Sequence, residues 1–244
     1  MKHLLAVVAV AGLAGSAWAD PILVSHPITT APIQAYVDGS ASGTTDVVQT
    51  NYDNWTNPNS ALTGVFTSGS DEIADDLHMV AFAGGNILDN MGINCANSTA
   101  ASNLTGGQIA IRFYDFTTGN FITGFNANLP ALSLAAGGSV RLSFGAGALL
   151  GLNIGVNQDM WVSLQWNSVT FSGAGTLADC GFQTRGPINI GTSADTMFNV
   201  TTASSFNFGG NPLANGGIFI NTPAPAGLSL LGLGGLIAGR RRRR

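Results

Sequence analysis

The chain has 244 residues, of which 45% are hydrophobic and only 9% are charged, and its formal net charge is −4. Lys2 and the five terminal arginines account for six of the nine basic residues, so residues 20–222 carry three arginines against thirteen acidic residues, a net charge near −10. Such a surface excludes nucleic-acid binding, which needs clustered lysine and arginine, and the absence of lysine after Lys2 excludes Walker-type phosphate loops and Schiff-base catalysis.

The N-terminal segment, residues 1–19, is typical of a secretory signal peptide. A short basic stretch precedes an apolar run over residues 4–15, and Ala17 and Ala19 form an A-x-A site that predicts cleavage before Asp20 by a signal peptidase. We therefore expect an exported protein, with the signal helix outside the fold.

Residues 20–60 form a polar N-terminal arm, in which 35–37 and 46–49 are candidates for edge strands. The body over residues 61–222 is predicted to be all-β, because no window shows a helical stripe with caps and turn residues separate the apolar runs. Strands are predicted over residues 77–82, 108–116, 140–144, 160–171, 198–202 and 216–221. Many short strands at this spacing favour a single β-sandwich of jelly-roll type.

The tryptophans offer one route to function. In the strand over residues 160–171, Trp161 lies on the face opposite Met160 and Trp166, so one of the two faces could present an indole ring to solvent. An exposed ring on Trp161 or Trp55 would stack on a sugar. Packing in the core is the alternative, and it is favoured because loops can cover both faces of a sandwich strand. Neither residue is assigned to a site.

The densest acidic segment is residues 71–76, predicted as a loop before the strand at 77–82. Asp71, Asp75 and Asp76 could supply carboxylates to one structural Ca²⁺. The alternative is a solvated acidic loop that discourages strand-edge pairing, and it is favoured because the D-x-D-x-D-G spacing of a calcium loop is missing.

No catalytic motif is present: H-E-x-x-H, G-x-S-x-G and C-x-x-C are all missing, and zinc lacks a ligand set. A glycoside hydrolase would need two carboxylates facing each other across a cleft. Asp89, Asp115, Asp159 and Asp179 are candidates for such a pair, but the sequence selects none of them. We expect a protein without enzymatic activity and without a cofactor other than the candidate calcium.

Cys95 and Cys180 are the only cysteines. In an oxidising compartment an isolated pair is most simply interpreted as one disulfide, which would contribute about 4 kcal/mol by closing a long loop. Two free buried thiols are the alternative.

The C-terminal segment, residues 223–244, has three parts in a fixed order. Pro223 and Pro225 predict an extended hinge over residues 222–225. The uncharged run over residues 226–238 would span about 20 Å as a helix, less than the ~30 Å of a bilayer core. A cluster of terminal arginines follows: Arg240, Arg241, Arg242, Arg243 and Arg244. These side chains would remain on the cytoplasmic side of the membrane.

This tail resembles the PEP-CTERM sorting signal, also called the ice-binding protein C-terminal domain, with Ala224 in place of the usual glutamate. The resemblance covers residues 223–244 only. It implies that a membrane-embedded exosortase recognises Pro223, Ala224 and Pro225 as substrate positions, cleaves near them and passes the body to the cell surface. The catalytic residues of that step belong to the exosortase.

Together these patterns predict an exported, non-enzymatic cell-surface or extracellular-matrix protein that passes through a membrane-anchored intermediate. The body is a candidate for contact with extracellular polysaccharide. The alternative is an extracellular glycan-binding module or a glycan hydrolase.

Overall fold

The computed structural model describes residues 21–37, 48–55, 61–67, 69–98, 102–145, 149, 151–194, 196–207 and 215–224. The expected signal peptide with its cleavage site, the C-terminal apolar run, Pro225 and the arginine cluster lie outside these residues. Within the described part of the chain, no helix is long and apolar enough to cross a membrane.

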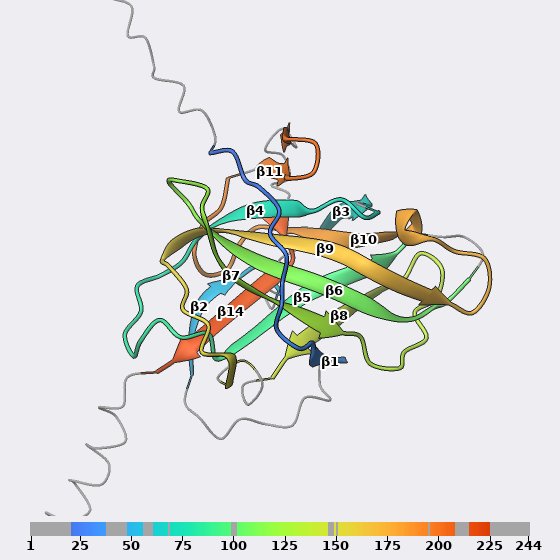
Figure 1. Cartoon of the computed structure of the whole chain (residues 1–244), viewed down its shortest axis with the longest axis horizontal. Coiled ribbons are helices and arrows are strands. Elements are labelled where there is room, and N and C mark those ends of the chain that lie inside the picture. The colour runs from blue at the N-terminus through green and yellow to red at the C-terminus, as the bar shows by residue number, and fades with distance from the viewer. Residues whose placement is uncertain are drawn as a thin grey trace, which may run out of the picture.

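The described residues form strands, and the all-β class is confirmed (Figure 1). The strands are β1 (Ile33–Val37), β2 (Val48–Asp53), β3 (Ala61–Thr67), β4 (Ile73–His78), β5 (Asn90–Asn97), β6 (Leu104–Asp115), β7 (Phe121–Asn128), β8 (Ser139–Phe144), β9 (Asp159–Phe171), β10 (Cys180–Gly186), β11 (Thr196–Asn199), β12 (Ser204–Asn207), β13 (Asn215–Gly216) and β14 (Ile218–Pro223). One turn of 3-10 helix, η1 (Leu177–Asp179), precedes β10.

The strands join in one large mixed sheet in the order β12-β11-β4-β9-β6-β7-β1-β8-β5-β10-β13, to which β14, β2 and β3 are attached as branches. Strand β1 connects the two parts of this order: Ile33 and Gln34 pair parallel with β7, and residues 35–37 pair antiparallel with β8. The candidate edge strand at 35–37 is therefore an interior strand. The jelly-roll sandwich stays a prediction.

The main hydrophobic core combines strands from both parts of the sheet order. From β9 it receives Met160, Val162, Leu164 and Trp166, so the predicted alternation of this strand is confirmed. From the other part of the order it receives Ile93, Leu142, Phe182 and Ile220, all at most 1% exposed.

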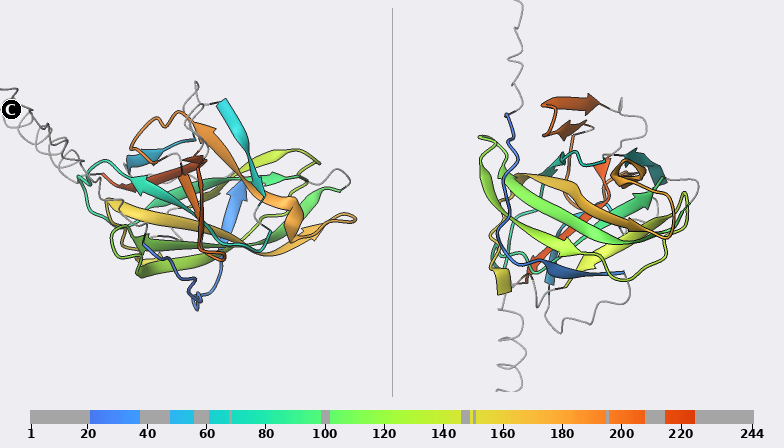
Figure 2. Two further views of the ribbon diagram at one scale, coloured as in Figure 1. Left: turned by 90° about the horizontal axis from the view of Figure 1, so that it is seen from above. Right: turned by 45° about the vertical axis from the view of Figure 1, so that its right-hand side comes forward.

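The first described residues, 21–28, form what we call the N-terminal strap, an extended segment that crosses the outer side of β6 and β9 (Figure 1). Leu23 is buried in a second hydrophobic cluster with Tyr114 and Trp161. The His26 ring stacks on Phe121 with 4.8 Å between centroids. Within the polar arm predicted for residues 20–60, the strap runs along the sheet to β1 (Figure 2) and contacts it through Leu23 and His26, while β1 and β2 pair with other strands.

Strand β4 corrects the prediction for the acidic segment. Residues 73–78 form a strand between β9 and β11, whereas the sequence predicted a loop up to residue 76 and a strand over 77–82. Burial of Ile73 and Leu77 stabilises this strand, and hydrogen-bond donors from other segments compensate its buried carboxylates.

The end of the described chain also differs from expectation. Pro223 is the last residue of β14 and pairs with Val48, and Thr222 donates from N and Oγ1 to Asn51 Oδ1 at 3.1 and 2.8 Å. Because a proline is tolerated where no further ladder hydrogen bond is needed, it can end the strand. The expected hinge therefore does not begin before Ala224.

Candidate functional site

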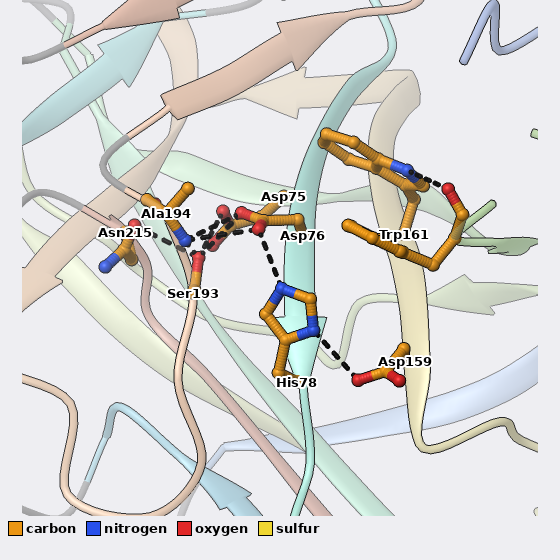
Figure 3. Close-up of polar contacts among 9 residues, drawn as sticks. Asp75, Asp76, His78, Asp159, Trp161, Ser193, Ala194 and Asn215 are labelled. Atoms are coloured by element: carbon orange, nitrogen blue, oxygen red, sulfur yellow. Dashed lines mark hydrogen bonds and ion pairs between the residues drawn. The ribbon is translucent and has the colours of Figure 1, made fainter. Parts of the chain in front are cut away.

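A continuous line of polar contacts runs from the buried middle of β4 to Asp159, the first residue of β9 (Figure 3). Asp159 also lines an open pocket. Adjacent residues Asp75 and Asp76 lie at the buried end of this line, Asp159 lies at its exposed end, and His78 stands between them. Two residues that are distant in sequence, Ser193 in the loop before β11 and Asn215 on β13, complete the buried end.

Asp75 is 1% exposed and belongs to the buried end of this line. Its Oδ2 accepts a hydrogen bond from Gly216 N at 2.7 Å, and its Oδ1 lies 3.1 Å from Ser193 Oγ. Burial, and next the neighbouring charge of Asp76, raise the pKa of Asp75 well above its usual value. Its ionised form is therefore costly in this environment.

Asp76 accepts hydrogen bonds from the loop that contains Ser193 and Ala194. Its two carboxylate oxygens accept from Ala194 N at 3.0 and 3.2 Å, and its Oδ1 lies 3.0 Å from Ser193 Oγ. Burial raises the pKa of Asp76, while the hydrogen bonds from Ala194 and Ser193 and the nearby His78 act in the opposite direction.

His78 connects the buried end to the surface. Its Nε2 lies 3.3 Å from Asp76 Oδ2, and its Nδ1 lies 2.8 Å from Asp159 Oδ1. A Ser-His-Asp triad needs the serine hydroxyl on a histidine nitrogen. Here both nitrogens face carboxylates and Ser193 contacts carboxylates, so the arrangement does not activate Ser193 as a nucleophile.

Asp159 lines a surface pocket of about 420 Å³. Its apolar walls include Phe82 and Phe116, and the Phe116 ring contacts His78 edge-on at 4.8 Å between centroids. The polar lining residues are Asn86, Asp115, Thr117, Asn157, Gln158 and Asp159. This combination of aromatic rings with amide and carboxylate groups suits a polar ligand that carries an apolar face.

The pocket contains two of the four aspartates that were candidates for a hydrolytic pair, Asp115 and Asp159. Asp115 Oδ1 accepts from Thr118 N and Thr118 Oγ1, both at 2.8 Å, and these bonds lower the pKa of Asp115. A general acid needs a raised pKa, so Asp115 does not fit that role. Its observed role is to hold the turn between β6 and β7.

The other two aspartates lie elsewhere. Asp89 is 1% exposed, and its backbone N donates to Asn221 O at 3.0 Å. Asp179 Oδ2 accepts from Thr176 N at 2.8 Å and caps η1. The structure therefore does not bring these two carboxylates to the pocket.

The predicted calcium ligands are not brought together as a set. Asp71 Oδ2 accepts from Asn199 Nδ2 at 2.8 Å, while Asp75 and Asp76 face Ser193. Among the residues that the structure describes, no group of three or more His, Cys, Asp or Glu side chains is arranged to hold a metal ion.

Neither tryptophan considered for sugar stacking is exposed. Trp161 is 4% exposed because the strap covers its face of β9 with Leu23, and Phe116 stacks on its ring at 5.9 Å. Trp55 is 1% exposed and packs against Phe219 at 4.3 Å. Core packing, the alternative interpretation, is correct for both.

Cys95 and Cys180 are free, buried thiols, so the expected disulfide is not formed in the structure. They lie on the paired strands β5 and β10, but Cys95 faces Phe182 and Cys180 is offset by two residues. Residues in that diagonal relation are about 7–8 Å apart, beyond the usual span of a disulfide.

Sequence reasoning missed Ser193, Asn215 and Tyr52. Ser193 and Asn215 lie in or beside Gly-rich segments without any spacing that relates them to β4. Long-range contacts bring these segments to β4: the backbone bridge between His78 and Thr192 places Ser193, and the hydrogen bond of Gly216 N to Asp75 places Asn215. No protein-family model, no curated protein and no solved structure matches the chain.

Proposed function

We propose that the chain is an exported, non-enzymatic cell-surface or extracellular-matrix protein, delivered by a C-terminal sorting signal of the PEP-CTERM type. The observation that carries this proposal is the order of the tail: Pro-Ala-Pro, whose first proline ends β14, is followed by an uncharged apolar run and five arginines. In this proposal the mixed sheet is folded as a jelly-roll sandwich.

The position of the tail supports an intermediate held at the membrane. Since β14 ends at Pro223, the apolar run over residues 226–238 follows the sheet after only two residues. An apolar segment shorter than the bilayer core can still be anchored when cationic side chains extend to the phosphate headgroups. An exosortase would then remove this segment and leave the body at the cell surface.

The experiment is intact-mass analysis of the protein from source cells with and without their exosortase, after separation into membrane, surface and medium. We expect the surface form to begin at Asp20 and to have lost the five arginines only when the enzyme is present. A control variant with Arg240–Arg244 changed to glutamine tests the charge requirement. Retention of the arginines on a membrane form in both strains contradicts the proposal and leaves a plain anchor.

A second candidate function is binding of extracellular glycan at the open pocket beside Asp159. The specific observation is the pairing of Phe82 and Phe116 with amide and carboxylate side chains around one open volume. Aromatic surfaces stack on sugar rings, and amides and carboxylates bind hydroxyl groups. The lowered pKa of Asp115 favours binding over hydrolysis.

This second function is tested by retention of the protein on immobilised acidic and neutral polysaccharides. Asn157 and Gln158 are exposed and line the pocket, so replacing both with alanine is expected to weaken retention about tenfold without affecting the fold. Asn207→Ala on edge strand β12, which does not line the pocket, is the matched control. Equal retention of all three proteins excludes the pocket as the glycan site.

A further inference from the structure

The Ser193 hydroxyl is surrounded by more acceptors than it can satisfy. Its Oγ lies 3.0 Å from Asp76 Oδ1, 3.1 Å from Asp75 Oδ1, 3.2 Å from Asn215 Oδ1 and 3.1 Å from the Ala194 carbonyl oxygen. A serine hydroxyl donates one hydrogen bond. At least three of the four oxygens therefore face Oγ without a proton from it.

The negative charge of the two buried carboxylates around Ser193 is also poorly compensated. Asp75 and Asp76 are 1% and 4% exposed, and of the described residues only His78 brings a potentially positive side chain to either of them, at 3.3 Å from Asp76 Oδ2. Buried carboxylates are normally paired with a positive charge or bound to a metal. The backbone adds only neutral donors: Gly216 N donates to Asp75 Oδ2, and Ala194 N donates to both oxygens of Asp76. Both Oδ1 atoms also lie within 3.1 Å of Ser193 Oγ.

Tyr52 on β2 provides an independent observation. Its hydroxyl is fully buried and makes no well-aligned hydrogen bond. Burial raises the pKa of Tyr52, the charges of Asp75 and Asp76 raise it further, and contact with the Ser193 hydroxyl acts in the opposite direction. A phenol next to buried carboxylates would ordinarily donate to one of them. Here the phenol oxygen instead adjoins Ser193 without a well-aligned bond to either carboxylate, so it adds a further oxygen to a set that already lacks positive charge.

The spacing of these oxygens matches the coordination shell of a hard cation. Ligand oxygens at about 2.3–2.6 Å from Ca²⁺, in a shell of six to eight ligands, are about 2.7–3.7 Å from their neighbours in the shell. The separations of Ser193 Oγ from the Asp75, Asp76 and Asn215 oxygens, 3.0–3.2 Å, fall within this interval.

We propose that Asp75, Asp76, Ser193 and Asn215 bind one divalent cation of the calcium class, with the Tyr52 hydroxyl at the edge of the site. Ca²⁺ accepts cages made mainly of protein oxygens, whereas Mg²⁺ usually retains several waters and demands regular octahedral geometry. The ligands differ from the set predicted from the sequence, because Asp71 is replaced by side chains from two distant segments. The ion would join β4, the 191–194 loop and β13.

The competing occupant is a proton. If one of the two carboxyl groups is protonated, it donates to Ser193 Oγ, which then donates to the other carboxylate, and no metal is required. The two alternatives respond differently to Ca²⁺, because only the metal site gains stability as the ion is added.

The test uses the full-length chain, stripped with a chelator and titrated with Ca²⁺ while thermal unfolding is followed, and in parallel with Tb³⁺ while luminescence is excited through the protein's aromatic side chains. Tyr52 and the nearby Trp161 make such sensitised luminescence possible. We expect saturation by about 1 mM, as in extracellular calcium modules, and a rise of several degrees in Tm.

Four variants locate the ion. Asp75→Asn and Asp76→Asn are expected to lower Ca²⁺ affinity at least about tenfold and to raise the Tm of the ion-free protein, because each removes an uncompensated buried charge. Ser193→Ala changes no charge and is expected to lower Ca²⁺ affinity. It replaces the aspartate variants in the test if one of them does not fold. Asp71→Asn, the matched carboxylate control, leaves Ca²⁺ affinity unchanged.

Two results overturn the proposal. If neither Tm nor luminescence of the wild-type chain changes up to about 10 mM Ca²⁺, the cluster holds a proton rather than a metal. If the Asp71 variant loses affinity while the Asp75 and Ser193 variants retain it, the ion binds at a different set of residues.

Discussion

At the scale of single residues, the outer side of β6 and β9 contains a buried charge pair beneath the N-terminal strap. Glu72 is the only glutamate in the chain; its Oε2 lies 3.2 Å from an Arg112 guanidinium nitrogen, and its Oε1 accepts from Tyr114 and Ser163 hydroxyls at 2.5 Å each. Arg112 Nε also donates to His26 O at 2.6 Å. The pair therefore connects the loop before β4 with the sheet and the strap.

Removal of one partner from this pair is expected to be strongly destabilising. Arg112→Met should lower the free energy of unfolding by about 3–5 kcal/mol, because it leaves the Glu72 carboxylate buried without a counter-charge. Adding Glu72→Gln to it should recover a large part of the loss. Urea denaturation of the two variants measures this, and a double variant less stable than Arg112→Met would contradict it.

The buried carboxylates predict an unusual pH dependence. Because burial and next Asp76 raise the pKa of Asp75 above 3.8, the native state holds more protons than the unfolded state from about pH 4 up to the raised pKa. The free energy of unfolding should therefore fall as pH rises through this interval. Asp115, whose pKa is lowered, acts in the opposite sense and only below about pH 4.

Urea denaturation in chelator at a series of pH values measures this slope. Asp75→Asn is expected to flatten it, and Asp71→Asn to leave it unchanged. A wild-type protein that becomes more stable from pH 4 upward would show that Asp75 and Asp76 are not the groups that dominate the linkage.

The two cysteines allow a direct chemical test. Burial raises the pKa of Cys180 to about 12, and that of Cys95 well above its usual value, so neither thiol should react with an aromatic disulfide reagent in the native protein near pH 8. After unfolding in guanidinium without reductant, two thiols per chain should react. If none reacts after unfolding, the disulfide predicted from the sequence has formed.

At the scale of elements, the N-terminal strap explains why Trp161 is buried, as the favoured interpretation of the sequence had it. Alternation along β9 identified its two faces, and the four core-facing side chains are where they were predicted. A segment more than 130 residues earlier covers the other face, and no local pattern reveals such a contact. Long-range coverage of a sheet face depends on the fold rather than on the strand that is covered.

Leu23 is the residue through which the strap should contribute most stability. Leu23→Ala is expected to cost about 2–3 kcal/mol, because the side chain is only 2% exposed and its removal leaves a cavity against Trp161. Ile22→Ala is the matched control, since Ile22 is 76% exposed and should change stability by less than about 0.5 kcal/mol. Equal losses in chemical denaturation would mean that the strap is not docked in solution.

Strand β4 was predicted wrongly, as a loop, because its buried carboxylates depend on distant hydrogen-bond donors. Four acidic residues within residues 71–76 predicted a solvated loop, since carboxylates are rarely buried. The prediction failed because the compensating donors, Ala194 N and Gly216 N, come from segments about 120 and 140 residues later. The same long-range contacts form the candidate site. Neither the strand nor the residues that contact its carboxylates could therefore be predicted from the local sequence.

At the scale of the whole molecule, the body extends from the strap to the end of β14. A chain ending at Ala224 should unfold cooperatively with a Tm within a few degrees of the full-length protein. A chain ending at Gly217 should not fold, because it loses Ile218 and Ile220, both fully buried, and the pairing of β14 with β2 and β5. Circular dichroism melts compare the two, and a folded chain ending at Gly217 would contradict this boundary.

Pro223 at the end of β14 has a mechanical consequence. A pulling force on the C-terminal segment is transmitted first to β14, along the strand axis. β14 is held by antiparallel ladders to β2 on one side and β5 on the other, so the load is shared by many hydrogen bonds in shear instead of opening them one at a time. A chain tethered by this end would resist detachment of its body under flow for as long as both ladders hold.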